Sequence, residues 1–127
     1  MAEELEWAPG VTAIEYVTDL GTTPASVNRR TGTIYINLRI WKRLPPSHRF
    51  FVLLHEMGHI VLKTKDEKAV DDWAFKEYAA RGYSLKESVK ALTRLLSFAG
   101  REHTERANLQ LARAKAFDRR VNKNFSV

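Results

Sequence analysis

The 127-residue chain contains no cysteine. This absence excludes disulfide bonds, cysteine-ligated zinc, thiol nucleophiles and iron–sulfur clusters. A bound metal ion would therefore take its ligands from histidine and carboxylate side chains. The sequence also lacks an apolar run of the ~18–20 residues that a membrane span needs, and its start, MAEELEW, lacks the basic and apolar regions of a signal peptide. We therefore expect a cytoplasmic protein without a membrane partner.

Glycine and proline are scarce in the second half of the chain, which predicts that strands and turns lie in the first half. Hydrophobic residues make up 44% and charged residues 28% of the sequence, close to the averages for soluble globular proteins. The length predicts one domain over residues 1–127, since domains have ~100–200 residues. We divide it into a strand-rich part (1–45), a central helical part (46–82) and a C-terminal helical part (83–127).

Positive charge is concentrated in the C-terminal part. The net charge is +6, yet residues 1–20 carry five acidic and no basic residues, whereas residues 101–127 carry seven basic and three acidic ones. A basic face permits nucleic acid as a partner, but a solvated helix face is the simpler interpretation. Its basic residues are Arg113, Lys115, Arg119, Arg120 and Lys123.

Three segments near the N-terminus have strand character. Residues 11–17 mix β-branched and aromatic side chains, and residues 25–27 precede a turn-rich stretch at 28–32. In residues 33–38, apolar and polar side chains alternate, as in a half-buried strand. We predict an α+β fold in which a small N-terminal antiparallel β-sheet packs on three to four α-helices.

Four helical segments follow. Ser47 is placed to cap a helix with apolar residues at helical spacing up to Val61, and residues 66–81 predict a second helix. Ser84 and Glu87 have capping-box spacing and open a third helix, which ends near residue 98. A fourth helix is expected from about 102 to 121, and its buried stripe is predicted to be Leu109, Ala112, Ala116 and Phe117.

The first predicted helix carries the sequence HEMGH, an HExxH motif formed by His55, Glu56 and His59. Residues four apart lie on one face of a helix, so both imidazoles can bind one zinc ion. Glu56 lies one step around the helix, where its carboxylate can act as a general base toward a zinc-activated water. The motif therefore predicts a Zn²⁺ site with His55 and His59 as ligands.

A catalytic zinc site needs a third protein ligand. The pattern HExxHxxGxxH fails, because Leu62 and Lys65 occupy the positions of its glycine and third histidine. Two candidates remain, Glu67 and the downstream His103. We favour Glu67, because it forms an ExxxD pattern with Asp71, which would support a ligating histidine.

Helix capping offers a competing role for Glu67. Thr64 and Glu67 have capping-box spacing, which would direct the Glu67 carboxylate back to the start of its own helix. Asp66 could cap the helix instead and free Glu67. Asp72 is the alternative to Glu67 as the third ligand and to Asp71 as the residue that supports a ligating histidine.

HEMGH followed by Glu67, Asp71 and Ala74 resembles the gluzincin metallopeptidases, including minigluzincins, HtpX-like enzymes and ImmA/IrrE-like regulatory peptidases. The resemblance covers about residues 33–80 and implies that Glu67 completes the zinc site and that Asp71 supports a ligand. It also implies that the strand at 33–38 borders the cleft and pairs with an extended substrate. The gap between His59 and Glu67 is short and requires a tight turn through residues 63–65.

HtpX-like enzymes carry a downstream histidine that stabilises the oxyanion and an arginine shortly after it. His103 and Arg106 loosely resemble this pair, which makes His103 a second candidate catalytic residue. Thr104 replaces the proline that usually follows the histidine.

The predicted function is zinc-dependent hydrolysis of a protein or peptide substrate. One alternative is a SprT-like protease that acts on DNA-bound proteins and uses a third histidine ligand. Another is a non-catalytic, zinc-stabilised interaction module. A deformylase-type amidase is disfavoured, because its metal site uses cysteine. Another copy of the chain is a further candidate partner, because small peptidases of this kind can be restrained by self-association.

Overall fold

The computed structural model describes residues 8–21, 23–97 and 104–122. Three strands come first: β1 (Ala13–Val17), β2 (Ala25–Asn28) and β3 (Thr33–Asn37). Five helices follow: α1 (Leu38–Trp41), α2 (Pro46–Val61), α3 (Glu67–Ala80), α4 (Leu85–Ser97) and α5 (Thr104–Asn122). The predicted α+β class is confirmed, and the single-turn helix α1 is an element that the sequence pattern did not indicate.

The sheet is mixed, so the prediction of an antiparallel sheet is wrong for one of its two pairs. The strand order is β1-β3-β2; β2 pairs with β3 antiparallel, whereas β1 pairs with β3 parallel. The buried Asn37 holds the segment that crosses over before β2, because its amide donates to the carbonyls of Gly21 (3.0 Å) and Thr23 (2.9 Å). This crossover is what aligns β1 with β3.

Strand β3 lies at the centre of the sheet and is buried on both faces. Ile34 and Ile36 are fully buried, as the alternation predicted, but Thr33 and Asn37 are buried as well and only Tyr35 remains half-buried. Asn37 also caps α1 by accepting a hydrogen bond from the backbone N–H of Arg39 (3.2 Å). Asn37 therefore serves the crossover and the helix cap and does not face solvent.

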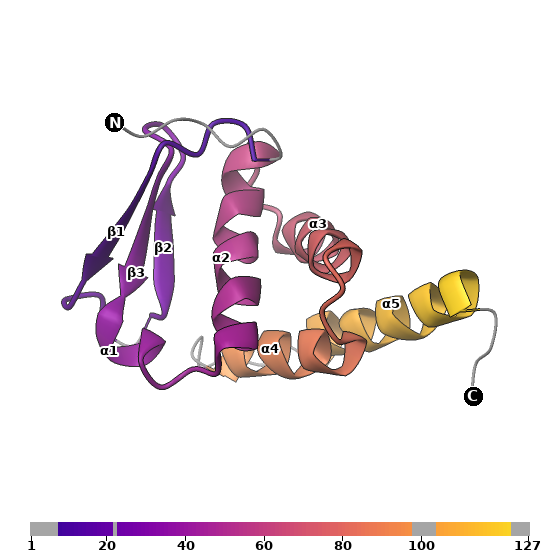
Figure 1. Cartoon of the computed structure of the whole chain (residues 1–127). Coiled ribbons are helices and arrows are strands. Elements are labelled where there is room, and N and C mark those ends of the chain that lie inside the picture. The colour runs from indigo at the N-terminus through magenta and orange to yellow at the C-terminus, as the bar shows by residue number, and fades with distance from the viewer. Residues whose placement is uncertain (1–7, 22, 98–103, 123–127) are drawn as a thin grey trace.

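Helix α2 is the central element of the fold. It packs against β2 on one side and against α3 and α4 on others, so that most of its surface is covered (Figure 1). It begins at Pro46, which needs no partner for a backbone N–H at this position. Ser47 does not cap it, contrary to our prediction, because no side chain caps this helix.

Helices α4 and α5 complete the core. The backbone N–H of Glu87 donates to Ser84 Oγ (3.3 Å), which confirms the predicted start of α4. The predicted stripe on α5 is wrong at Leu109, Ala112 and Ala116, which are exposed. Among the described side chains of α5, those of Gln110 and Ala114 are buried, and those of Arg106, Ala107, Arg113 and Phe117 are half-buried.

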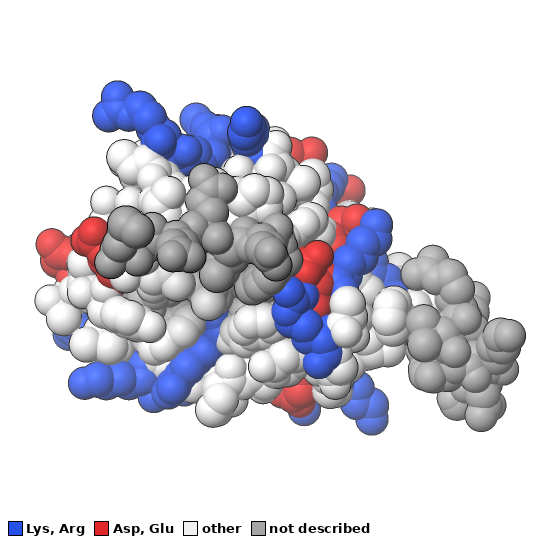
Figure 2. Space-filling view, turned by 45° about the horizontal axis from the view of Figure 1, so that its top comes forward, with Lys and Arg blue, Asp and Glu red and all other residues white. Residues whose placement is uncertain are grey.

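Basic side chains project from several edges of the molecule, and acidic side chains lie beside some of them (Figure 2). Among the described helices, none is both long enough and apolar enough to span a membrane. The charged residues of α3 illustrate the mixed surface, since Asp72 pairs with Lys76 (2.9 Å) and with Arg113 of α5 (3.3 Å).

Candidate metal centre

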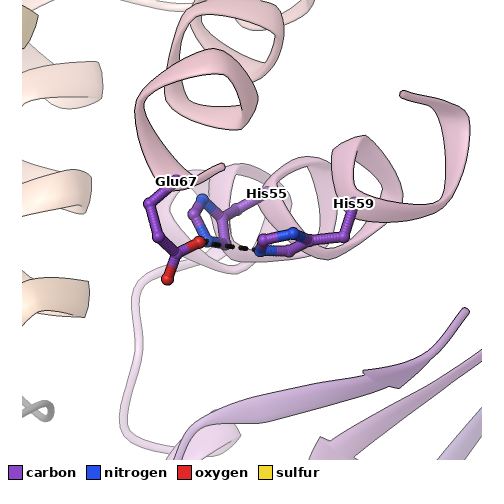
Figure 3. Close-up of side chains that lie close together, drawn as sticks. All are labelled: His55, His59 and Glu67. Carbon is purple, nitrogen blue, oxygen red and sulfur yellow. Dashed lines mark ion pairs between the residues drawn. The ribbon is translucent and has the colours of Figure 1, made fainter. Parts of the chain in front are cut away.

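Helix α2 presents His55 and His59 side by side. The two rings come from successive turns of the helix, with centroids 5.0 Å apart and planes nearly perpendicular. His55 is buried and His59 is half-buried, so the His55 ring lies deeper in the protein than the His59 ring. Both rings point toward Glu67, which comes from the start of α3 (Figure 3).

Glu67 is free to face the histidines because Asp66 caps α3. The Asp66 carboxylate accepts hydrogen bonds from the backbone N–H groups of Lys68 (3.1 Å) and Ala69 (3.4 Å). Thr64 Oγ1 accepts from the N–H of Asp66 (3.0 Å), so the alternative Thr64–Glu67 capping box does not form. Glu67 Oε1 instead lies 2.8 Å from His59 Nε2 and 3.3 Å from His55 Nε2.

A tight turn and a close helix contact bring α3 to α2. Lys63 has a left-handed backbone (φ 53°), and the N–H of Thr64 donates to the carbonyl of His59 (3.2 Å), which ends α2. Gly58 lets the helices approach, because a Cβ there would lie 2.9 Å from Val70 Cγ1. This turn allows the seven residues between His59 and Glu67 to connect the two helices.

The geometry of the three side chains fits a metal ion. One donor atom from each of His55, His59 and Glu67 lies within 4.8 Å of the others. His59 Nδ1 lies 2.8 Å from the carbonyl of Thr64, to which it donates as N–H, so Nε2 is the nitrogen that would lose its proton and offer a lone pair to a metal ion. Two imidazoles and one carboxylate form a donor set that suits zinc.

Asp71 and Arg106 support the inner side of this group. Asp71 is fully buried, and its Oδ1 lies 3.2 Å from His55 Nδ1, although the two atoms are not aligned for a hydrogen bond. Arg106 of α5 donates to both carboxylate oxygens of Asp71, at 2.7 and 2.8 Å, and its Nη1 lies 3.7 Å from Glu67 Oε2. Asp72, the alternative to Asp71, points to Lys76 and Arg113 and contributes nothing here.

The charges of the group stabilise one another. Burial opposes the imidazolium of His55, but the carboxylates of Asp71 and Glu67, each close to one of its ring nitrogens, outweigh burial and raise the pKa of His55 to about 9. Hydrogen bonds with His55 and His59 hold the pKa of Glu67 well below its usual range. Burial favours a protonated Asp71, but Arg106 and His55 outweigh burial and lower the pKa of Asp71. In the absence of a cation, protons on the imidazoles thus balance the carboxylates.

Glu56 lies beside the group without belonging to it. Its side chain is buried, and burial raises its pKa although His55 and His59 act in the opposite direction. It lines two cavities together with His55 and Glu67, one of about 200 Å³ and one of about 310 Å³. A carboxylate with a raised pKa next to a potential metal position is suited to proton transfer.

Strand β2, and not β3, borders these cavities. Ala25 lines both of them, and Ser26 and Val27 line the larger. The expectation that residues 33–38 border the cleft is therefore wrong, because β3 is paired on both edges and has no edge to offer. β2 is an edge strand of the sheet.

Several other titratable side chains of the described residues lie apart from the group. His103 falls outside the described residues. His48 is buried at the start of α2 and contacts Glu87 of α4 through Nε2 (2.9 Å). Tyr78 is fully buried and donates its hydroxyl to the carbonyl of Ser47 (3.0 Å), in surroundings that raise its pKa to about 12 through burial. Tyr83 stacks on Tyr78.

Arg106 is the residue whose role sequence reasoning missed. The sequence indicates Arg106 only through a loose resemblance, and its partner Asp71 lies 35 residues away. The available signal was the buried acid itself, since a buried carboxylate requires a counter-charge.

Comparison with models of protein families, with curated proteins and with solved structures finds no match.

Proposed function

We propose that this chain is a zinc-dependent metallopeptidase of the gluzincin type. The observation that carries the proposal is the convergence of His55, His59 and Glu67 next to the buried Glu56, at the wall of a cavity. Catalytic zinc sites use three protein ligands and leave one position open. The Glu67 side chain is 47% exposed, which places the open side of the group toward solvent.

A bound zinc ion would polarise the carbonyl of the scissile bond and lower the pKa of a coordinated water. Glu56 would accept a proton from the attacking water and deliver it to the leaving amine. Asp71 would orient His55, and Arg106 would keep Asp71 ionised. The free edge of β2 would pair with an extended substrate backbone.

The proposal is tested by metal content and by cleavage of a peptide library, both on protein prepared without chelators. Wild type and Glu56→Gln should each bind one zinc ion, but only wild type should cleave peptides. Glu67→Ala should lose zinc. Asp72→Ala is the matched control, since Asp72 lies on the same helix and pairs elsewhere, and it should keep both zinc and cleavage.

The outcomes separate the alternatives. Wild-type protein that binds zinc but cleaves no peptide would indicate a non-catalytic zinc-stabilised module. Zinc that survives Glu67→Ala but not His103→Ala would indicate the SprT-like ligand set. Wild-type protein that binds no zinc would refute the proposal.

A further inference from the structure

The two cavities beside the candidate metal centre adjoin each other, and together we call them the trough. They share the walls made by Ala25, His55, Glu56 and Glu67. The edge strand β2 runs along the trough from Ala25 toward the β2–β3 turn. A peptide that pairs with β2 would therefore pass the metal centre with one part at each end of the trough.

The two ends of the trough differ in chemistry. At the start of β2, the walls include Pro24 and two leucines of α4, Leu95 and Leu96, and Leu96 is 6% exposed. At the end near the β2–β3 turn, the walls include Arg29 and Lys65, both exposed. One end is thus partly apolar and the other is basic.

The cations at the basic end lack partners. Neither Arg29 nor Lys65 has an ion pair within the parts of the chain that the structure describes, whereas Arg106 at the apolar end is paired with Asp71. Arg29 also lines an adjoining cavity together with Arg30 and Lys63, and no acidic residue of the described ranges lines that cavity. Unpaired cations around a concave surface create a positive potential that attracts anions.

We propose that the trough selects peptides with acidic side chains on one side of the reacting bond and an apolar side chain on the other. The acidic side chains would meet Arg29 and Lys65, and the apolar side chain would meet Leu95 and Leu96. This specificity rests on the proposed peptidase function, but recognition can be measured without cleavage.

The test uses the full-length Glu56→Gln protein, with and without added zinc, and fluorescein-labelled peptides of equal length. One peptide carries two glutamates on one side of a central alanine and a leucine on the other; its counterpart carries two lysines in place of the glutamates. At low salt the acidic peptide should bind about ten-fold more tightly, since its glutamates meet opposite charges at Arg29 and Lys65 whereas the lysines of its counterpart meet like charges. This preference should weaken in 0.5 M salt, at which the Debye length is roughly 4 Å.

Charge reversal locates the preference. Adding Arg29→Glu and Lys65→Glu should abolish or invert it. The matched control is Lys86→Glu with Lys115→Glu, at exposed lysines of α4 and α5. It changes the net charge by the same amount as the trough pair and should leave the preference intact. In wild-type protein, cleavage-site sequencing should find acidic residues enriched on only one side of the cleaved bonds.

The inference is overturned if both peptides bind equally, or if the control pair removes the preference as fully as the trough pair does. If discrimination persists but wild-type protein cleaves no peptide, the proposed peptidase function fails and the trough remains a binding site for acidic peptides. If wild type cleaves peptides without any charge preference, the function stands and the specificity is refuted.

Discussion

Replacing Arg106 by methionine tests how strongly α5 is tied to the candidate metal centre. Asp71 is fully buried and the Arg106 side chain is 12% exposed, so the substitution leaves a carboxylate without its main counter-charge. Removal of one partner from a buried ion pair costs about 3–5 kcal/mol. His55 remains 3.2 Å from Asp71 and compensates part of this loss, so we expect Arg106→Met to lower the free energy of unfolding by about 2–3 kcal/mol.

The assay is urea unfolding of zinc-free protein at pH 7, with Asp71→Asn and the double variant measured in parallel. The double variant should lose about 1–3 kcal/mol less than the sum of the single variants, since residues in one ion pair are energetically coupled. Lys76→Met is the control, because Lys76 pairs with the exposed Asp72 and should change stability by less than about 1 kcal/mol. Additive single effects, or a loss below about 0.5 kcal/mol for Arg106→Met, would refute the reasoning.

Three further predictions concern other parts of the fold. Gly58→Ala should destabilise the protein by about 1–2 kcal/mol in urea unfolding, because its Cβ would lie 2.9 Å from Val70 Cγ1 and the gain in helix propensity offsets only part of the overpacking; an unchanged midpoint would contradict this. Lys63→Gly should raise the free energy of unfolding by up to about 1 kcal/mol, because it relieves a left-handed backbone, and a lower thermal midpoint would count against it. The bond with His48 holds the pKa of Glu87 below its unfolded value of 4.5, so its contribution to stability is present above pH 4.5 and is lost as the pH falls through the folded pKa. Wild type and Glu87→Gln should therefore differ in unfolding midpoint at pH 7 and converge in acid, and a difference that grows in acid would reverse this assignment.

The local parts of the candidate site were predictable from sequence. HExxH spacing on a helix fixes the relation of His55 to His59, and cap chemistry allowed Asp66 to free Glu67, as the structure confirms. Metal binding and catalysis by these residues stay predictions. The contact of Arg106 with Asp71 depends on how α5 packs on α3, and no local pattern reports that packing.

The sequence pattern did not predict the pairing direction of β1. Alternation identifies the buried face of a strand but not the direction of its neighbour, and the parallel pair depends on a crossover held by the buried Asn37. The stripe on α5 was misplaced for a related reason. The apolar spacing predicts a buried stripe there, whereas the buried face among the described side chains of α5 centres on Gln110 and Ala114, next to the half-buried Arg106.

The candidate ligands lie close together in the sequence, within residues 55–67. An ion that joined them would close a short loop, and the entropy removed from the unfolded chain by such a closure grows only with the logarithm of loop length. A metal ion would therefore fasten the α2–α3 hairpin locally, while the cohesion of the sheet with α4 and α5 rests on their shared hydrophobic core. Loss of the ion would leave the site without its metal but the protein folded. Small zinc domains, in contrast, unfold without their metal.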